Sequence, residues 1–128
     1  EMLVTVKKYG QAFLPYSPLM QGLLAGRFAG RRKFSKKDIR NENPKFFGET
    51  FEKYYKAYEE LQALADEMGH PINELSLNWL RQKPEVTSII NGVSSIEQLQ
   101  SNLNSLSWDI SDEYMAKIET IIAPFENI

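Results

Sequence analysis

Apolar and polar residues follow a helical spacing over two stretches in the middle of the chain. Between Glu49 and Met68, apolar or aromatic side chains recur every three or four residues, which predicts an amphipathic helix. Gly69 marks its end. A second stretch with the same spacing begins at Ile72 and ends before Pro84. Two consecutive helices are therefore expected here.

Two short apolar runs predict strands. Residues 12–16 are almost continuously apolar, and residues 86–90 are β-branched and mostly apolar. Such runs are typical of strands buried on both faces of a parallel sheet. The first ten residues read like the end of a helix that Gly10 stops, so we expect the chain to begin in the middle of a fold.

Serine residues mark the expected starts of the last two helices. Ser95 and Gln98 fit the Ser-x-x-Gln pattern of a capping box, which opens a helix towards Asn104. Its apolar residues share one face: Ile96, Leu99 and Leu103. Ser111 is expected to cap a final helix that Pro124 ends. The buried stripe of that helix is Met115, Ile118, Ile121 and Ile122.

The order of these elements predicts the fold class. Two strand–helix units with insertions are typical of an α/β fold with parallel strands. Two strands cannot close a barrel. If these are barrel units, the remaining strands lie in sequence outside this chain, and the isolated chain exposes strand edges and apolar faces.

Composition narrows the function classes. A chain of 128 residues with 42% hydrophobic and 25% charged content suits one compact domain. The absence of cysteine and the single histidine argue against a disulfide framework and a zinc site. The net charge of -2 argues against nucleic-acid binding. No apolar run is long enough to span a membrane and no signal peptide is evident, so a cytoplasmic location is expected.

The residues after the two predicted strands are the candidates for chemistry, because ligands of α/β folds lie beyond the carboxyl ends of strands. In residues 92–102, Ser94 and Ser95 place hydroxyls at a helix N-terminus, which favours a phosphate. The alternative is that Ser95 only caps its helix. In residues 17–27, backbone groups and Arg27 could surround a ligand, or the segment is simply a turn-rich connection.

Other polar residues have structural interpretations. His70 lies in a Gly-His-Pro turn between two helices, which indicates a surface turn. Trp79 and the tyrosines Tyr54, Tyr55 and Tyr58 fit packing stripes. The acid pairs at 59–60 and 66–67 fit a solvated helix face. The basic stretch from Arg27 to Arg40 is either a surface loop or a lid over a pyrophosphate.

Four motifs, in order, resemble those of aldo-keto reductases, in the branch related to bacterial general-stress reductases and potassium-channel β subunits. The first is Pro15-Tyr16-Ser17-Pro18-Leu19-x-Gln21-Gly22-x-Leu24-x-Gly26-Arg27-Phe28, and the second is Asp38-Ile39-Arg40 with Pro44-Lys45-Phe46 and Glu49. The third is Leu75-Ser76-Leu77-x-Trp79-Leu80, and the fourth is Gly92-x-Ser94-Ser95-x-x-Gln98-Leu99-x-x-Asn102-Leu103. The resemblance spans nearly the whole chain. It implies the C-terminal part of a TIM (β/α)8 barrel, about its last two strand–helix units with extra helices. Residues 1–128 would then be the C-terminal portion of one barrel domain whose N-terminal portion is absent from the chain.

The resemblance also implies a cofactor, NADP(H), with NAD(H) as the alternative. The first loop would lie along the nicotinamide ribose and pyrophosphate through Ser17, Leu19, Gln21, Gly22 and Leu24, with Arg27 near the phosphates. In the second loop, Gly92 and Ser94 would face the 2′-phosphate, with Gln98 beside them and Asn102 at the adenine. Many relatives carry proline, a cation and glutamate where this chain has Asn91, Ser94 and Ser101, so weaker discrimination between NADPH and NADH is expected.

The same resemblance implies hydride transfer from NADPH to an aldehyde or ketone, with a tyrosine as proton donor. The catalytic tyrosine, lysine, aspartate and histidine of the family come from earlier strands, so this chain is expected to hold no catalytic residue and to be inactive alone. The alternative is a nucleotide-sensing regulatory or interaction subunit of the same family. A third possibility is a mostly helical binding module that stands alone.

Overall fold

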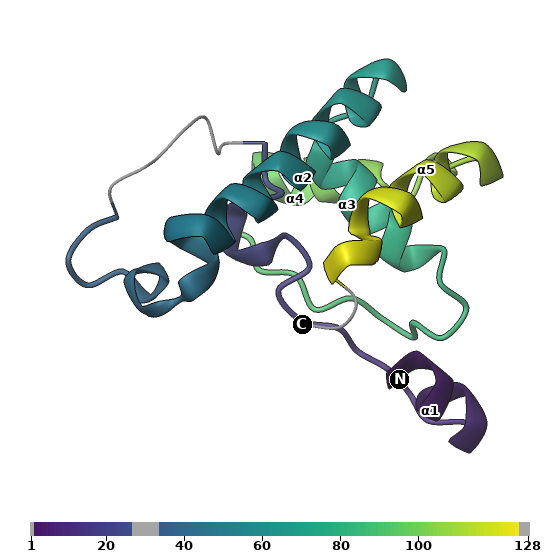
Figure 1. Ribbon diagram of the computed structural model, residues 1–128. Coiled ribbons are helices and arrows are strands. Elements are labelled where there is room, and N and C mark those ends of the chain that lie inside the picture. The colour runs from purple at the N-terminus through teal and green to yellow at the C-terminus, as the bar shows by residue number, and fades with distance from the viewer. Residues whose placement is uncertain (1, 27–33, 126–128) are drawn as a thin grey trace.

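Helices dominate the part of the chain that the structure describes. The structure is a computed structural model and describes residues 2–26 and 34–125. Its α-helices are α1 (Met2–Tyr9), α2 (Gly48–Glu67), α3 (Ile72–Arg81), α4 (Ile96–Asn104) and α5 (Asp112–Ile122) (Figure 1). Short 3-10 helices add η1 (Met20–Gly22), η2 (Ile39–Glu42), η3 (Pro44–Phe46) and η4 (Ala123–Phe125). All five predicted α-helices are therefore confirmed.

The main core lies where α2, α3 and α5 meet, and α4 packs on α3. Five of its buried members come from the predicted apolar stripes: Leu61, Ala65, Ile72, Leu75 and Ile118. The sixth, Ile110, lies just before α5 and was not predicted. The remaining stripe residues of α5, Met115, Ile121 and Ile122, pack against this cluster and are partly buried. Helical periodicity thus identified the core faces, because a helix buries the residues that recur every three to four positions.

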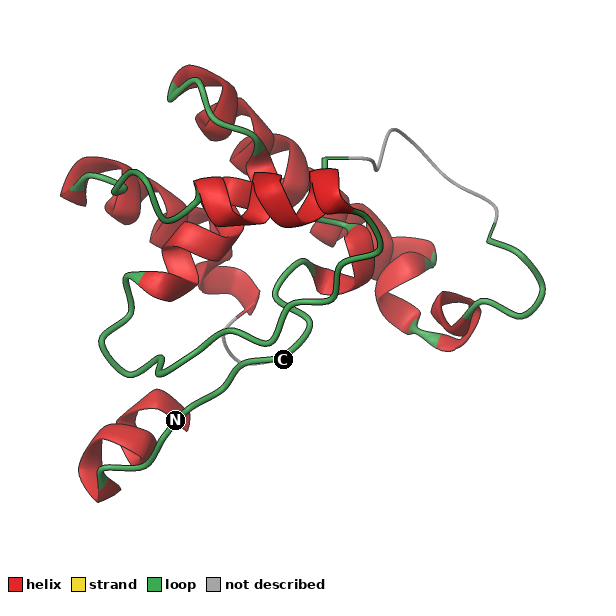
Figure 2. Cartoon of the chain, turned by 180° about the vertical axis from the view of Figure 1, so that it is seen from behind, coloured by secondary structure: helices red, strands yellow, loops and turns green. Residues whose placement is uncertain are grey.

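The two predicted strands are not formed as strands among the described residues. Residues 11–15 and 86–89 are extended, and a single parallel bridge joins Tyr16 to Ile90. The backbone N–H of Thr87 donates to Phe13 O, and that of Ile90 donates to Pro15 O, both at 2.9 Å. Seen from behind, the two segments run beside each other as loops (Figure 2). Two segments joined by one bridge do not form a sheet, and an isolated pair of strands is only marginally stable.

The long connection from Ser17 to Gly48 contains ordered structure in its described parts. A second apolar cluster of Leu23, Phe46, Phe51 and Tyr54 fixes this connection against α2. Glycine ends two helices in the left-handed conformation: Gly10 has φ +60° after α1 and Gly69 has φ +73° after α2. Such a residue carries no Cβ penalty there, which explains why both predicted stops are correct.

The predicted helix caps are only partly correct. Ser95 Oγ accepts from Gln98 N at 3.2 Å, as in a capping box. The Gln98 side chain, however, accepts from Ser94 N at 2.9 Å and not from Ser95 N, so the reciprocal half is displaced by one residue. Ser111 occupies the N-cap of α5, but its side chain makes no capping hydrogen bond. The positions of both cap residues were predicted correctly, but the full set of capping hydrogen bonds was not.

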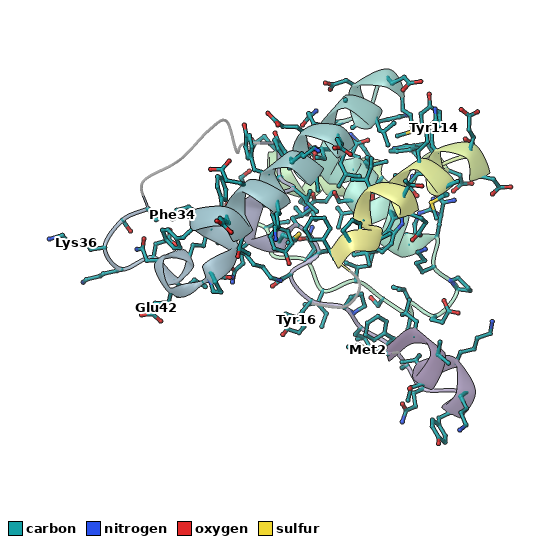
Figure 3. All side chains as sticks on the ribbon, viewed as in Figure 1. Met2, Tyr16, Phe34, Lys36, Glu42 and Tyr114 are labelled. Carbon is teal, nitrogen blue, oxygen red and sulfur yellow. The ribbon has the colours of Figure 1, made fainter. Side chains whose placement is uncertain are left out.

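Several large apolar side chains are exposed among the described residues. Met2 on α1 and Tyr16 in the first extended segment are 64% and 80% exposed and point away from the helical core (Figure 3). The predicted apolar face of α4 is also exposed, at 72% for Ile96 and 53% for Leu103. Large exposed apolar side chains of this kind are candidates for contact with another part of a protein.

The turn between α2 and α3 is more constrained than a surface turn. The His70 ring stacks on Trp108 with centroids 3.8 Å apart, and its Nδ1 lies 3.6 Å from Glu74 Oε2. Trp108 Nε1 donates to the same carboxylate at 3.2 Å. Glu74 is buried, so these contacts satisfy a charge that would otherwise be costly to bury. The predicted Gly-His-Pro turn is confirmed, but the His70 ring packs on Trp108 and is not simply a surface side chain.

Candidate functional site

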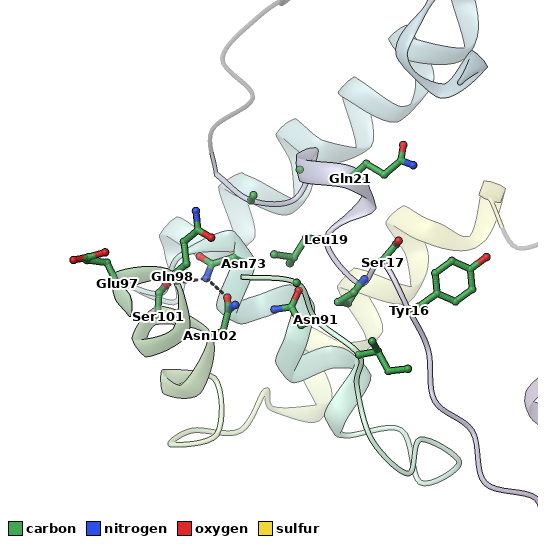
Figure 4. A pocket seen from close by; sticks show the side chains of 15 residues that line it. Tyr16, Ser17, Leu19, Gln21, Asn73, Asn91, Glu97, Gln98, Ser101 and Asn102 are labelled. Atoms are coloured by element: carbon green, nitrogen blue, oxygen red, sulfur yellow. Dashed lines mark hydrogen bonds between the residues drawn. The ribbon is translucent and has the colours of Figure 1, made fainter. Parts of the chain in front are cut away.

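The pairing of the two extended segments brings two loops together. Because Tyr16 and Ile90 are bridged in parallel, both segments leave toward the same side. The loop after Tyr16 leads into η1, and the loop after Ile90 leads into α4. A pocket of about 590 Å³ lies between them and is closed on a third side by α3 (Figure 4). This is the arrangement expected for ligand sites of α/β folds.

Side chains from three elements line this pocket. The first loop contributes Tyr16, Ser17, Pro18, Leu19, Gln21, Gly22 and Ala25. The second loop and α4 contribute Ile90, Asn91, Gly92, Glu97, Gln98, Ser101 and Asn102, and α3 contributes Asn73. Seven of the ten predicted cofactor residues are thus brought together: Ser17, Leu19, Gln21, Gly22, Gly92, Gln98 and Asn102.

The first loop is held in an unusual backbone conformation. Ser17, Met20 and Gln21 have φ values of +54°, +47° and +54°, which non-glycine residues rarely adopt. Gly22 follows with φ +99°, a value that disfavours any side chain. Backbone strain of this kind costs about 1–3 kcal/mol per residue and concentrates at ligand sites. The strain therefore supports a binding role for this loop.

Arg40 of η2 and Asn43, which lies between η2 and η3, contact the strained loop. Arg40 Nη1 donates to Gln21 O at 3.3 Å, and Asn43 Nδ2 donates to Gln21 Oε1 at 2.9 Å. Arg40 is itself held by Asp38, which accepts from Arg40 Nη2 at 2.6 Å. The side-chain hydrogen bond from Arg40 lowers the pKa of Asp38 from 3.8 to about 2. The Arg40–Asp38 pair therefore stays ionised at any ordinary pH and keeps the loop in place.

Three carboxamides at the pocket have their oxygens occupied by protein donors. Gln21 Oε1 accepts from Asn43 Nδ2 at 2.9 Å, and Gln98 Oε1 accepts from Ser94 N at 2.9 Å. Asn102 Oδ1 accepts from Nδ2 of Asn73 on α3 at 3.3 Å. The amide nitrogen of each side chain then remains as its unpaired polar group within the described residues. The pocket consequently presents hydrogen-bond donors to a ligand.

A fourth amide adds an unsatisfied donor. Asn91 Nδ2 is buried and has no hydrogen-bond partner among the described residues. An unpaired buried amide costs about 1–3 kcal/mol, so a partner from a ligand would recover free energy. The start of α4 supplies further partial positive charge through its free N–H groups. Together these groups fit a ligand rich in oxygen acceptors, such as phosphates and ribose.

Among the described residues, Glu97 is the one acidic side chain in the pocket lining. Hydrogen bonds from its own backbone N–H and from the Ser95 hydroxyl lower the pKa of this carboxyl group. Ser95 Oγ also accepts from Gln98 N, so this serine caps the start of α4. The capping interpretation of Ser95 is confirmed, and phosphate binding at this helix start stays a prediction.

The sequence matches that of a known protein family over nearly its whole length. The model of the aldo/keto reductase family matches residues 1–123. The chain belongs to the aldo/keto reductase family.

Individual relatives agree with this family. The chain is 28% identical to aldo-keto reductase str7 of Strobilurus tenacellus, over 94% of the chain and 36% of that protein. It is 29% identical to an L-glyceraldehyde 3-phosphate reductase of Escherichia coli, over 98% of the chain and 37% of that protein. The solved structure of a glycerol dehydrogenase from Gluconobacter oxydans matches with a TM-score of 0.84 and 27% identity, over 98% of the chain and 38% of that protein. The chain thus spans somewhat over a third of these relatives.

Two of the predicted cofactor residues, Leu24 and Ser94, lie away from the pocket lining. Leu24 lines a separate, mainly apolar hollow of about 400 Å³ between the first loop and α2, α3 and α5. Ser94 N and Oγ both contact Gln98 Oε1, so this serine orients Gln98 and is not part of the lining. Arg27 lies outside the described residues. The prediction that these three contact the cofactor stays a prediction for this member of the family.

Eight of the lining residues were not predicted as ligands, among them Asn73, Asn91 and Ser101. Asn91 and Ser101 differ from many aldo-keto reductases and adjoin Gly92 and Asn102, so their positions already pointed to the site. Asn73 had no such signal, because it comes from α3, almost twenty residues before the second loop. Only tertiary packing of α3 on α4 places it there.

Two findings bear on other classes of site. Among residues 2–26 and 34–125, no group of three or more His, Cys, Asp or Glu side chains is arranged to hold a metal ion. Within the same residues, no helix has the length and apolar character needed to cross a membrane.

Proposed function

We propose that this chain forms the nucleotide-binding part of a reductase that transfers hydride from NADPH to an aldehyde or ketone. NAD(H) is the alternative cofactor, because no arginine or lysine lines the pocket among the described residues. The observation that carries the proposal is the pocket between the two loops, whose amide side chains present donors beside the start of α4. Named relatives of the family include reductases and a glycerol dehydrogenase, which supports redox chemistry on carbonyl or alcohol groups.

The chain's own residues would bind and orient the cofactor. Ser17, Leu19, Gln21 and Gly22 would hold one portion of it, and Gly92, Gln98 and Asn102 the other. The bound nicotinamide would supply the hydride. The proton donor would come from residues outside this chain, and the isolated chain is therefore expected to reduce no carbonyl compound.

We also propose that residues 1–128 are the C-terminal portion of a single barrel domain. The chain matches relatives over 36–38% of their lengths. The exposed apolar side chains of the extended segments and α4, among them Tyr16, Ile90 and Ile96, would be covered by the rest of the barrel. A cooperative unfolding transition of the isolated, monomeric chain would contradict this proposal and favour a self-standing helical module.

The cofactor assignment is tested with a matched pair of glutamine variants on α4. Gln98→Glu keeps the oxygen that accepts from Ser94 but replaces the free amide donor with a negative charge. Gln100→Glu adds the same charge at an exposed position outside the pocket lining. In the complete protein, Gln98→Glu should raise the NADPH dissociation constant by about tenfold, corresponding to about 1.4 kcal/mol.

The measurement is a fluorescence titration with NADPH, and with NADH in parallel. Gln100→Glu should change the dissociation constant by much less than Gln98→Glu. Equal effects of the two variants, or no binding of either cofactor by the unmodified protein, would refute the assignment.

A regulatory subunit that senses the nucleotide is the second candidate. It is favoured by the lining of the pocket, where the described residues offer only Tyr16 and Glu97 as titratable groups, and Tyr16 is 80% exposed. Turnover of an aldehyde by the complete protein discriminates between the two candidates. NADPH binding without consumption of NADPH would favour the regulatory subunit.

A further inference from the structure

Asn73 in the first turn of α3 connects that helix to α4 at one wall of the pocket. Its Nδ2 donates to Ser101 Oγ at 2.9 Å and to Asn102 Oδ1 at 3.3 Å (Figure 4). All three side chains line the pocket and are partly buried. The contacts that join the two helices are therefore made by the same side chains that face the ligand.

These two hydrogen bonds decide which atoms the wall offers. A carboxamide carries its oxygen and its NH2 group on opposite branches, so an occupied oxygen leaves the NH2 group of Asn102 for the pocket. Ser101 Oγ likewise accepts from Asn73, which leaves its hydroxyl hydrogen to donate. With Asn73 as the donor, both α4 side chains act as donors toward the pocket.

We propose that Asn73 is a positioning residue that sets this wall as a hydrogen-bond donor surface. The part of the ligand bound there would carry acceptors, namely purine ring nitrogens or the oxygens of a ribose or phosphate. The proposal rests on the proposed function for the identity of that ligand as a nicotinamide dinucleotide. Asn73 acts through Ser101 and Asn102 and does not take part in the chemistry.

A purely structural role for Asn73 predicts a different ranking of variants. Asn73→Asp offers two acceptor oxygens, so it can still link the helices by accepting from the Ser101 hydroxyl and the Asn102 amide. That linkage turns Asn102 around and points its oxygen into the pocket. Asn73→Ala breaks both hydrogen bonds but leaves Ser101 and Asn102 free to donate. If Asn73 only links the two helices, Asn73→Ala should weaken ligand binding more than Asn73→Asp. If Asn73 sets the donor character of the wall, Asn73→Asp should weaken binding more.

The test measures binding of adenosine 2′,5′-bisphosphate, a probe for the adenosine end of the cofactor, to the complete protein. Asn73→Asp should weaken binding by about tenfold, and Asn73→Ala by less. The thermal midpoint should follow the opposite order, with Asn73→Ala below Asn73→Asp. Gln100→Glu serves as the charge control, because it adds a carboxylate to α4 outside the lining. Titration in about 0.5 M salt screens simple charge repulsion further.

Three results would overturn the inference: unchanged affinity of Asn73→Asp, a greater loss in Asn73→Ala than in Asn73→Asp, or an equal loss in Gln100→Glu. Each of these leaves binding by the unmodified protein intact. Absence of binding of both NADPH and adenosine 2′,5′-bisphosphate to the unmodified protein would instead refute the proposed function. The two failures are therefore distinguishable.

Discussion

Replacing Asn78 with alanine should loosen the segment after α4 from α3. Asn78 is completely buried, and its Nδ2 donates to Trp108 O at 2.7 Å. Its Oδ1 accepts from Arg81 at 2.6 Å and 3.2 Å. The same arginine also donates to Trp108 O at 2.9 Å and pairs with Asp109. Asn78 is therefore the buried centre of a network that joins α3 to residues 108–109.

The expected loss of stability follows from these contacts. The hydrogen bond to Trp108 O contributes about 0.5–1.5 kcal/mol, and the charged contacts with Arg81 about 1.5–3 kcal/mol. Because Arg81 and Trp108 O keep each other as partners, neither is left unpaired, and the lower halves of these ranges apply. The free energy of local opening should therefore fall by about 2–3 kcal/mol.

Hydrogen exchange of the complete protein provides the assay. A fall of about 2 kcal/mol corresponds to roughly thirtyfold faster exchange of the affected backbone amides. The Ile110 N–H, which donates to Gln82 Oε1 at 2.7 Å, lies in this segment and should report the change. Gln100→Ala, at an exposed site on α4, should leave the exchange rate unaltered. Acceleration of less than about threefold in Asn78→Ala would refute the assigned role of this network.

Two further predictions concern the strained loop and its anchor. Gly22→Ala places a side chain at φ +99°, which should cost about 1–3 kcal/mol of stability and weaken NADPH binding by shifting the loop. Gly69→Ala, at φ +73°, is the control and should lower stability without weakening NADPH binding. Equal NADPH affinity of the two variants would contradict this prediction. Since the folded pKa of Asp38 is about 2, below its usual 3.8, its stabilising contribution is complete above that usual value and is lost as pH falls through 2. The difference in unfolding free energy between the unmodified protein and Asp38→Asn should therefore vanish near pH 2, and a constant difference down to that pH would count against the pair.

The helices follow from the sequence because their signals are local. The spacing of Leu61, Ala65 and Ile118 identified residues that the core buries. Gly10 and Gly69 ended helices where the sequence indicated, since a positive φ is a property of the residue itself. The two loops of the site were also predictable, because both follow short apolar runs and carry motifs of the aldo/keto reductase family.

Strand pairing and side-chain orientation do not have that local origin. Residues 12–16 and 86–90 have strand-like sequences, but a strand exists only with partners on its edges, and here one bridge joins them. The apolar face of α4 was predicted from spacing, yet Ile96 and Leu103 are exposed because nothing among the described residues covers them. Periodicity shows which residues share a face and cannot show what packs on it.

The polarity of the pocket was decided by side-chain contacts that form only in the folded chain. The sequence indicated that Gln21, Gln98 and Asn102 belong to the two segments expected to bind a cofactor. Their amides became donors only because Asn43, Ser94 and Asn73 occupy the oxygens, and Asn43 and Asn73 reach them from distant parts of the chain. An amide has both a donor and an acceptor, so its residue type leaves the choice open until a neighbour takes one of them.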